Sequence, residues 1–389
     1  MIYEGSHRLG DLFSSRREKG KAGLPVLSVT MNDGLVNRED LERKQESSLS
    51  PEEHLLVREG DIAYNMMRMW QGAFGLATNA GMVSPAYVVL VSNESVAPLF
   101  ASYLFKTNRV LHLFWAYSHG LTEDRLRLYF DDFSKIPVTI PDLQEQGKIG
   151  EILATWDKAL KVAKRLLENS RQQKLALMQN LLTGNKRITD FNGPWQVRYL
   201  GDLFSERVET GFISLPLLSI TREAGVIPRE DVSEKDVSSG DKSNYRRICP
   251  GDIGYNTMRM WQGISALSNL EGIVSPAYTI VTPNDQIQGR FAAHLFKHLP
   301  MVFQFYRYSQ GLVSDTWNLS YRDFSSIKVK IPSVPEQKAI ADILDGAENS
   351  VQIVEGLILR LENEKRALMQ QLLTGKRRVH LPASEAARA

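Results

Sequence analysis

The sequence predicts an α+β fold in which two homologous mixed α/β domains are separated by two long antiparallel helices, a coiled-coil-like spacer with pseudo-two-fold symmetry. Three observations predict it: the chain repeats itself, each copy contains short runs typical of strands, and each copy ends in a long stretch with helical periodicity. The chain has 389 residues, enough for two or three domains, and its 43% hydrophobic and 24% charged residues are ordinary for a globular protein.

The repeat has a constant offset of 191 residues. The segment Gly60–Gly72, GDIAYNMMRMWQG, returns as GDIGYNTMRMWQG at Gly251–Gly263, and LGDLF at Leu9–Phe13 returns at Leu200–Phe204. Because the offset does not change, no net insertion separates the copies. The domain boundaries that follow are 1–141 and 191–332 for the two mixed domains, 142–190 for the first helix with its linker, and 333–389 for the second helix with the C-terminal tail.

Each copy is predicted to combine strands with a shorter helix. Helical periodicity is found in Pro98–Ala116, and Pro141 closes the mixed domain before the long helix begins. Strands are predicted where β-branched and aromatic residues are bounded by Gly, Asn or Asp: Leu24–Thr30, Asp61–Asn65, Ala86–Val91 and Ile136–Ile140.

The long helices are predicted at Gln144–Gly184 and Pro335–Gly375, each about 60 Å long at 1.5 Å per residue. Their apolar residues recur at three- and four-residue steps, as in helices that pack along one another. Ser170 and Lys174 interrupt this pattern, and a surface helix lying on its own domain's core remains the alternative. The positions predicted to form the helix–helix contact are Ile149, Leu153, Trp156, Leu160, Leu167 and Met178 in the first helix, and Ile340, Leu344, Val351, Val354, Ile358 and Met369 in the second.

Composition limits the classes of protein to consider. No apolar run is long enough to span a membrane, and the N-terminus lacks the layout of a signal peptide, so a cytoplasmic protein without a membrane partner is expected. The single Cys249 excludes an intrachain disulfide and fits a reducing compartment. The net charge of +2 does not by itself indicate a nucleic-acid partner, so any such argument depends on local features.

One repeated segment, Tyr64–Gly72 with its copy Tyr255–Gly263, carries side chains suited to reading DNA bases. Arginine pairs with guanine, asparagine and glutamine pair with adenine, and aromatic rings contact sugars or thymine methyl groups. The alternative is a half-buried strand in which Met69 and Trp70 pack in the core. The candidate DNA-binding residues here are Tyr64, Asn65, Arg68, Trp70, Gln71, Tyr255, Asn256, Arg259, Trp261 and Gln262.

A second candidate region is the loop Ser118–Arg127 and its copy Ser309–Asn318. The two loops diverge after Leu121 and its counterpart, as expected if one scaffold presents loops that read different sequences, although drift of an exposed loop would have the same effect. We also expect Lys106 and Lys297 to contact phosphates, the alternative being ordinary solvated lysines. The loop candidates are Thr122, Arg125 and Ser314.

No catalytic or metal-binding residue is predicted. The segments LLTGNK and LLTGKR lack the upstream glycine and strand of a phosphate-binding loop. None of the seven histidines is matched between the copies, which argues against a duplicated catalytic or metal site.

The order of these segments carries a family resemblance. Ile140-Pro141-Asp142-Leu143-Gln144-Glu145-Gln146 followed by Ile149, and Ile331 to Gln337 followed by Ile340, each open a long helix that ends in LLTG. This duplicated layout resembles the specificity subunit of type I restriction-modification enzymes. The resemblance implies a non-catalytic reader of double-stranded DNA whose two domains each read half of a split target. It also implies that the helices set the spacing and dock two modification subunits, which bind S-adenosylmethionine and methylate adenine, and through them the restriction subunits; no cofactor is expected in this chain.

One feature departs from the family pattern. The two recognition domains usually differ widely, whereas here the segments YNxMRMWQG and VSPAY are nearly the same in both copies. We therefore expect the two halves of the target to be related in sequence. The alternatives from other classes are a duplicated scaffold that assembles partner proteins without touching DNA, and a self-contained methyltransferase that binds S-adenosylmethionine.

Overall fold

The computed structural model describes residue 3 and residues 6–31, 33–41, 49–122, 125–222, 224–232, 239–312 and 316–379. Its contacts divide the chain into two units. Unit 1 is built from Met1–Lys164 together with Gly356–Ala389, and unit 2 from Arg165–Glu355. Each unit therefore contains a segment of both long helices, although these segments are far apart in the sequence.

The centre of unit 1 is a four-stranded antiparallel sheet with the order β2-β9-β6-β7, formed by Phe13–Arg16, Tyr87–Ser92, Ile62–Asn65 and Phe74–Leu76. The other elements are the strand pairs β1 (Ser6–Arg8) with β10 (Pro137–Thr139), β3 (Leu27–Val29) with β4 (Leu35–Asn37) and β5 (Leu55–Val57) with β8 (Gly81–Val83), the helices α1 (Leu9–Leu12), α2 (Pro98–Leu104), α3 (Asn108–Ala116) and α4 (Phe130–Phe133), and the 3-10 turns η1 (Arg38–Asp40), η2 (Pro51–Glu53) and η3 (Met69–Gln71).

Unit 2 repeats this arrangement around the sheet β12-β19-β16-β17, and the predicted mixed α/β domain thus occurs twice. The register is also repeated, since Ile62 pairs with Leu90 in unit 1 and Ile253 with Val281 in unit 2. The elements of unit 2 are the strands β11 (Gln196–Tyr199), β12 (Phe204–Glu206), β13 (Leu218–Ile220), β14 (Val226–Pro228), β15 (Arg246–Ile248), β16 (Ile253–Asn256), β17 (Ser265–Leu267), β18 (Gly272–Val274), β19 (Tyr278–Pro283) and β20 (Lys328–Ile331), the helices α6 (Leu200–Leu203), α7 (Gly289–Lys297), α8 (Leu299–Tyr308) and α9 (Tyr321–Ser325), and the turns η5 (Arg229–Asp231) and η6 (Met260–Gln262).

The core of unit 1 is organised around the buried ring of Phe105. Its centroid lies 5.3–5.8 Å from those of Phe13, Phe74, Phe114 and Phe133, mostly in the edge-to-face arrangement that aromatic quadrupoles favour. Rings from the sheet and from the helices α3 and α4 therefore meet at one point. This cluster holds the helices against one face of the sheet.

The stretch predicted to be one helix, 98–116, forms two helices instead. Thr107 has an extended backbone, with φ −73° and ψ 142°, and α3 starts after it. In unit 2 the break is visible in the sequence, because Pro300 has no N–H to continue the helical hydrogen bonds of α7. The predicted strands appear as β3, β6, β9 and β10, with ends that differ by a few residues.

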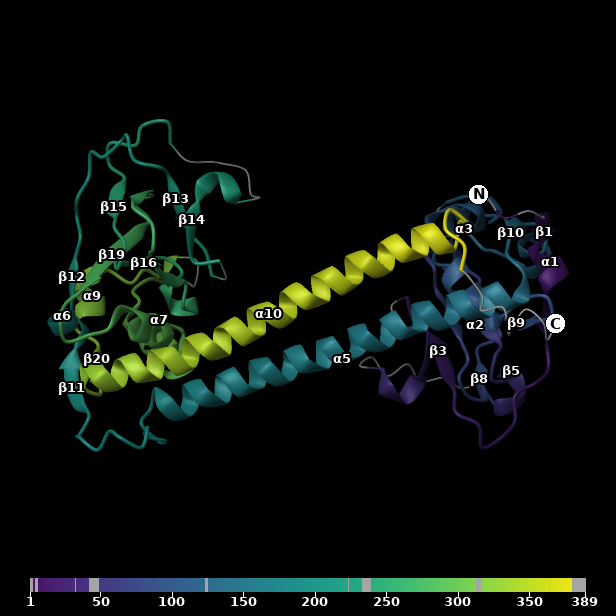
Figure 1. The fold of residues 1–389 in the computed structure, drawn as a ribbon, viewed down its shortest axis with the longest axis horizontal. Coiled ribbons are helices and arrows are strands. Elements are labelled where there is room, and N and C mark those ends of the chain that lie inside the picture. The colour runs from purple at the N-terminus through teal and green to yellow at the C-terminus, as the bar shows by residue number, and fades with distance from the viewer. Residues whose placement is uncertain are drawn as a thin grey trace. The chain divides into compact units, whose positions relative to one another are not determined.

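The long helices are α5 (Leu143–Leu181) and α10 (Val334–Leu372), of 39 residues each, and both are continuous in Figure 1. Their ends enter the cores of the units. In unit 1, Ile149 and Leu153 pack in the main core with Leu372, and in unit 2, Ile340 and Leu344 pack in the core with Met178. For these turns the helix lies on its own domain's core, which was the alternative interpretation.

Further along the helices, buried residues lie outside these cores. Leu160 in unit 1, and Val351 and Val354 in unit 2, are at most 9% exposed. Ion pairs between α5 and α10 lie on either side of these residues, which supports helix–helix packing as the cause of their burial. The remaining positions of the predicted contact are only partly buried: Trp156, Leu167, Ile358 and Met369.

The two helices are antiparallel within each unit, as predicted. In unit 1, Asp157 pairs with Lys365, and Lys164 pairs with Glu362 at 3.1 Å, so that residue numbers rise along α5 while they fall along α10. In unit 2, Arg171 pairs with Glu355 at 2.6 Å and Lys174 with Glu348. None of the helices in the described ranges is long and apolar enough to cross a membrane.

Each long helix is fixed to its domain by the glutamine of the IPxxxEQ segment. The buried Gln146 donates through Nε2 to the carbonyl oxygens of Pro141 (2.8 Å) and Ser95 (3.1 Å), and its Oε1 accepts from the N–H of Ala97 at 2.9 Å. Gln337 makes the same three contacts in unit 2. The glutamine side chain thus forms hydrogen bonds with main-chain groups at the start of α2 or α7, and so links that start to the start of the long helix.

Candidate nucleic-acid interface

The turn that follows β6 is folded by its own side chains. Asn65 Oδ1 accepts a hydrogen bond from the N–H of Met67 at 2.9 Å, and Trp70 Nε1 donates to the carbonyl oxygen of Met67 at 3.1 Å. Gly72 then adopts φ 89°, a left-handed conformation that favours glycine. Asn65 and Trp70 therefore have a structural role in shaping the turn, in addition to any contact with a ligand.

The turn after β16 is built in the same way. Asn256 Oδ1 accepts from the N–H of Met258 at 3.0 Å, and Trp261 Nε1 donates to the carbonyl oxygen of Met258 at 3.0 Å. Gly263 has φ 78°. Since both copies keep these contacts, the near identity of the two segments is explained in large part by the turn that they must form.

The predicted residues of this segment divide into buried and exposed sets. Tyr64 and Tyr255 are fully buried in the sheet, and Tyr64 donates to the carbonyl oxygen of Leu128 at 3.2 Å. The prediction that these two tyrosines contact DNA is therefore wrong, because their alternating strand positions point them into the core. Met69 and Met260 are core residues as well. The exposed residues are Arg68, Gln71 and Arg259, while Asn65, Trp70, Asn256, Trp261 and Gln262 are half-buried.

The second predicted region lies directly against this turn. The N–H of Leu128 donates to the carbonyl oxygen of Met66 at 2.9 Å, and His119 and Arg127 exchange two backbone hydrogen bonds that close the loop Ser118–Arg127. In unit 2 the N–H of Leu319 donates to Thr257 in the same way. The fold thus brings together two segments separated by about 50 residues, and forms one continuous surface from them.

The turn and the loop of unit 1 carry three described arginines. Arg68, Thr122, Arg125 and Arg127 are all exposed, and within the described residues none of the three arginines forms an ion pair. Asp132 lies at the base of the loop, bonded by His119 and Lys135. Partial burial would raise the pKa of this carboxyl, but the hydrogen bonds from Lys135 and His119 outweigh it and lower the pKa. Its negative charge is thereby balanced locally.

Aromatic packing distinguishes the surface of unit 2. Trp317 meets Trp261 edge-to-face with centroids 5.1 Å apart, and Tyr306 at 4.9 Å. The equivalent of Trp317 in unit 1 is Leu126, so the two surfaces share a backbone but differ in the side chains on it. Ser314 lies outside the described residues.

Sequence reasoning missed two cations of this surface. Arg127 belongs to the loop already singled out but was not selected from it. Arg222 is exposed and donates to the carbonyl oxygen of Gln262 at 2.9 Å, next to the turn in unit 2. The repeat could not have identified Arg222, because its counterpart is Met31.

Lys106 and Lys297 have charged neighbours on the long helices. Desolvation lowers the pKa of Lys106, and the nearby Lys365 lowers it further while Asp157 opposes. Desolvation likewise lowers the pKa of Lys297, with Glu348 opposing and Lys174 adding to the effect. Their charges therefore interact with the helix pair. A phosphate contact by these lysines stays a prediction.

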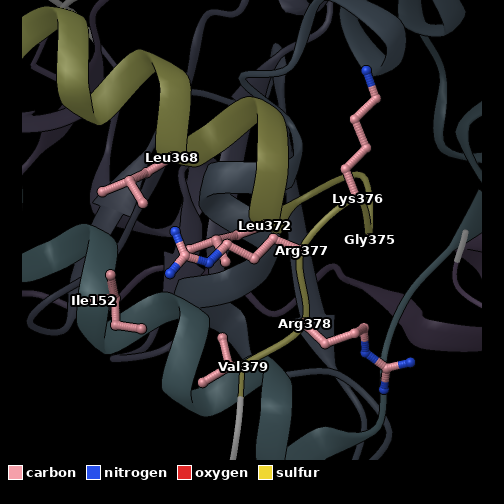
Figure 2. Close-up of a pocket in the computed structure, with 8 residues that line it drawn as sticks. All are labelled: Ile152, Leu368, Leu372, Gly375, Lys376, Arg377, Arg378 and Val379. Atoms are coloured by element: carbon pink, nitrogen blue, oxygen red, sulfur yellow. The ribbon is translucent and has the colours of Figure 1, made fainter. Parts of the chain in front are cut away.

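A pocket in unit 1 lies at the end of α10 (Figure 2). Ile152, Leu368 and Val379 form its apolar wall, and Lys376 and Arg378 extend away from the hollow. Arg378 is bound instead to the buried carboxylate of Glu145, through Nε at 2.8 Å. The lining contains no acid paired with a base, so it offers no arrangement for proton transfer. Within the described ranges there is also no group of three potential metal ligands among His, Cys, Asp and Glu.

Comparisons with known proteins agree on one family. The family model described as the type I restriction modification DNA specificity domain matches residues 8–169 and 257–363. The type I restriction enzyme MjaVIII specificity subunit of Methanocaldococcus jannaschii is 24% identical over 364 residues, which cover 84% of this chain and 81% of that protein.

Solved structures share the fold. The S subunit of a type I restriction-modification system from M. genitalium has a TM-score of 0.59 at 15% identity, covering 95% of this chain and 96% of that one. The HsdS subunit from Thermoanaerobacter tengcongensis has a TM-score of 0.50 at 15% identity, with the same two coverages.

Proposed function

The chain belongs to the type I restriction-modification DNA specificity family, and from this premise we propose that each unit reads one half of a bipartite DNA target. The reading surface is the turn after β6 or β16 together with the loop packed against it. In this proposal the chain is a non-catalytic subunit that binds no cofactor itself. It acts in the cytoplasm, as a subunit of a complex whose modification subunits bind S-adenosylmethionine and methylate adenine.

The observation that carries this proposal is the position of two arginines, without an ion pair among the described residues, on turns that are held by hydrogen bonds. Arg68 and Arg259 occupy matched positions, each exposed at the start of η3 or η6, and each turn is fixed by the hydrogen bonds of its asparagine and tryptophan. An arginine on a rigid support can form two hydrogen bonds with guanine O6 and N7. In this proposal the surrounding arginines and Thr122 contact phosphates.

The long helices are the proposed docking site for two modification subunits. In unit 1 the apolar side chains of Val162 and Leu357 are 69% and 43% exposed, and in unit 2 those of Leu166 and Ile353 are 47% and 71% exposed. Val162 and Ile353 are matched by the repeat, as are Leu166 and Leu357. Repeated exposed apolar positions support two equivalent binding events for one kind of partner.

The experiment combines methylation profiling with binding. Long-read sequencing of a host that carries the chain with its modification subunits identifies the methylated motif. Fluorescence anisotropy of the purified complex should then show tighter binding to a duplex that contains both half-sites than to duplexes with either half scrambled. Affinity for every duplex should fall steeply with salt, because phosphate contacts release counterions. Equal affinity for all duplexes would contradict the proposal.

The other candidate is a duplicated scaffold that assembles proteins and does not read DNA. It predicts a stable complex with the modification subunits but no difference between the intact and the scrambled duplexes. The same titration therefore separates the two functions. A self-contained methyltransferase would require S-adenosylmethionine to bind the isolated chain, which calorimetry tests directly.

A further inference from the structure

The ion pairs between α5 and α10 are related to one another by the 191-residue repeat. Adding 191 to the residue of α5 and subtracting 191 from that of α10 converts the pair Asp157–Lys365 of unit 1 into the pair Glu348–Lys174 of unit 2. Asp157 of α5 and Glu348 of α10 therefore occupy the same repeat position, and so do Lys174 of α5 and Lys365 of α10. These pairs would therefore also form if a helix met a second copy of itself.

The remaining two pairs lie at positions that the repeat also relates, but there the charge at each repeat position is opposite in the two helices. Lys164–Glu362 at 3.1 Å in unit 1 converts into the positions of Glu355–Arg171, which pair at 2.6 Å in unit 2. Here α5 carries both bases, Lys164 and Arg171, and α10 carries both acids. The charges at these four positions are complementary only between unlike helices.

The apolar contacts do not make this distinction. The buried Leu160 and Ala163 of α5 occupy the positions of Val351 and Val354 in α10, so that both helices present small to medium apolar residues there. A pairing between two copies of α5 would keep an apolar seam. It would place Lys164 opposite Arg171 of the other copy, and a pairing between two copies of α10 would place Glu355 opposite Glu362.

We propose that Lys164, Arg171, Glu355 and Glu362 select the partner helix, so that α5 accepts α10 and rejects a second α5. The two halves of the chain are then complementary partners and cannot replace one another. Where the helices are exchanged with a second copy of this chain, the exchange occurs between unlike halves. Charges that flank an apolar seam have this role in coiled coils, where repulsion against the wrong partner contributes as much as attraction.

Each ion pair contributes little free energy, but the contributions of the two pairs have the same sign and add. The four side chains are 41–61% exposed, so each pair is screened by water and salt. Changing partner converts two attractive pairs into two repulsive ones at every like seam. Selection therefore depends on the difference in free energy between the α5–α10 seam and a seam of two like helices. This difference is larger than the contribution of one ion pair.

The test uses the full chain, with the apolar seam unchanged, and measures the thermal midpoint by calorimetry. The neutral variant is Lys164→Gln with Arg171→Gln. Two further variants imitate the rejected seams, Glu355→Lys with Glu362→Arg and Lys164→Glu with Arg171→Glu, and a reversed variant combines all four of these charge changes. Circular dichroism checks that every variant is folded before it is heated.

We expect the neutral variant to melt about 2 °C below the wild type and both like-charged variants about 5 °C below it. The reversed variant should recover most of the loss. The differences should shrink in 0.5 M NaCl, an ionic strength chosen because it screens exposed charges. Like-charged variants no less stable than the neutral one, or a reversed variant that does not recover, would overturn the proposal. The thermal midpoints are measured without DNA, so the outcome of this test is independent of the proposed function.

Discussion

Arg187 holds the buried carboxylate of Glu336 through two hydrogen bonds, from Nε to Oε1 at 2.6 Å and from Nη2 to Oε2 at 2.8 Å. The segment that follows α5 is thereby tied to the first turn of α10 within unit 2. The repeat gives the same tie in unit 1, where Arg378 binds Glu145. Glu336 and Glu145 are only 1% and 2% exposed, so each depends on its arginine for compensation.

Replacing Arg187 with Met should destabilise unit 2 by about 3 kcal/mol, because removing one partner leaves a buried charge uncompensated. Urea unfolding followed by tryptophan fluorescence measures the loss. The matched control is Arg171→Met, whose partner Glu355 is 44% exposed and whose loss should stay below about 1 kcal/mol. Similar losses in the two variants would contradict this account of Glu336.

Replacing Arg68 with Ala should relax discrimination at one half-site by about 1–3 kcal/mol, and Arg259→Ala should do the same at the other half-site. The measurement compares intact duplexes with duplexes that carry single-base changes. Lys148→Ala, a half-buried position on α5, serves as the control. A uniform loss over all sequences would assign Arg68 to a phosphate contact instead.

The methylated motif should have related halves. The two turns share Arg68 and Arg259 on the same backbone, so the bases that they read are expected to be the same or similar. Methylation profiling gives the motif directly. Unrelated halves would place the discrimination in the loops, where Trp317 of unit 2 replaces Leu126 of unit 1.

Stability should rise with pH in the mildly acidic range because of His294. Desolvation lowers the pKa of His294, although its hydrogen bond to Asp345 at 2.7 Å opposes this. Between the lowered folded pKa and the unfolded value near 6.5, the unfolded state binds more protons, so acidification favours unfolding. His294→Gln should flatten the dependence of the unfolding free energy on pH. The buried His298, whose pKa desolvation also lowers, contributes in the same direction and remains in the variant.

Lengthening both long helices by one heptad should increase the gap between the half-sites by about 3 base pairs, since seven residues add about 10.5 Å. The insertion is placed at matched positions after Val162 and Ile353 so that the repeat is kept. Methylation profiling of a host with the lengthened chain reads the new gap. An unchanged gap would show that the length of the helices does not set the distance between the half-sites.

Periodicity and the repeat were sufficient to predict the mixed domain, the strands near β6 and β9, and both long helices. They could not show which side of a strand faces the core, and for this reason Tyr64 and Tyr255 were assigned to DNA. Nor could spacing reveal that Gln146 and Glu145 have structural partners far along the chain. The contact between the turn and the loop Ser118–Arg127 depends on long-range packing, which local patterns do not encode.

The anchoring of the long helices has an evolutionary consequence. Gln146 and Gln337 bind only carbonyl and N–H groups of the main chain, which every residue type except proline provides in full. Recombination could thus import a new set of surface loops between the anchored segments without needing any compensating change in the helix that carries them. New target preferences would then arise by replacement of these loops alone.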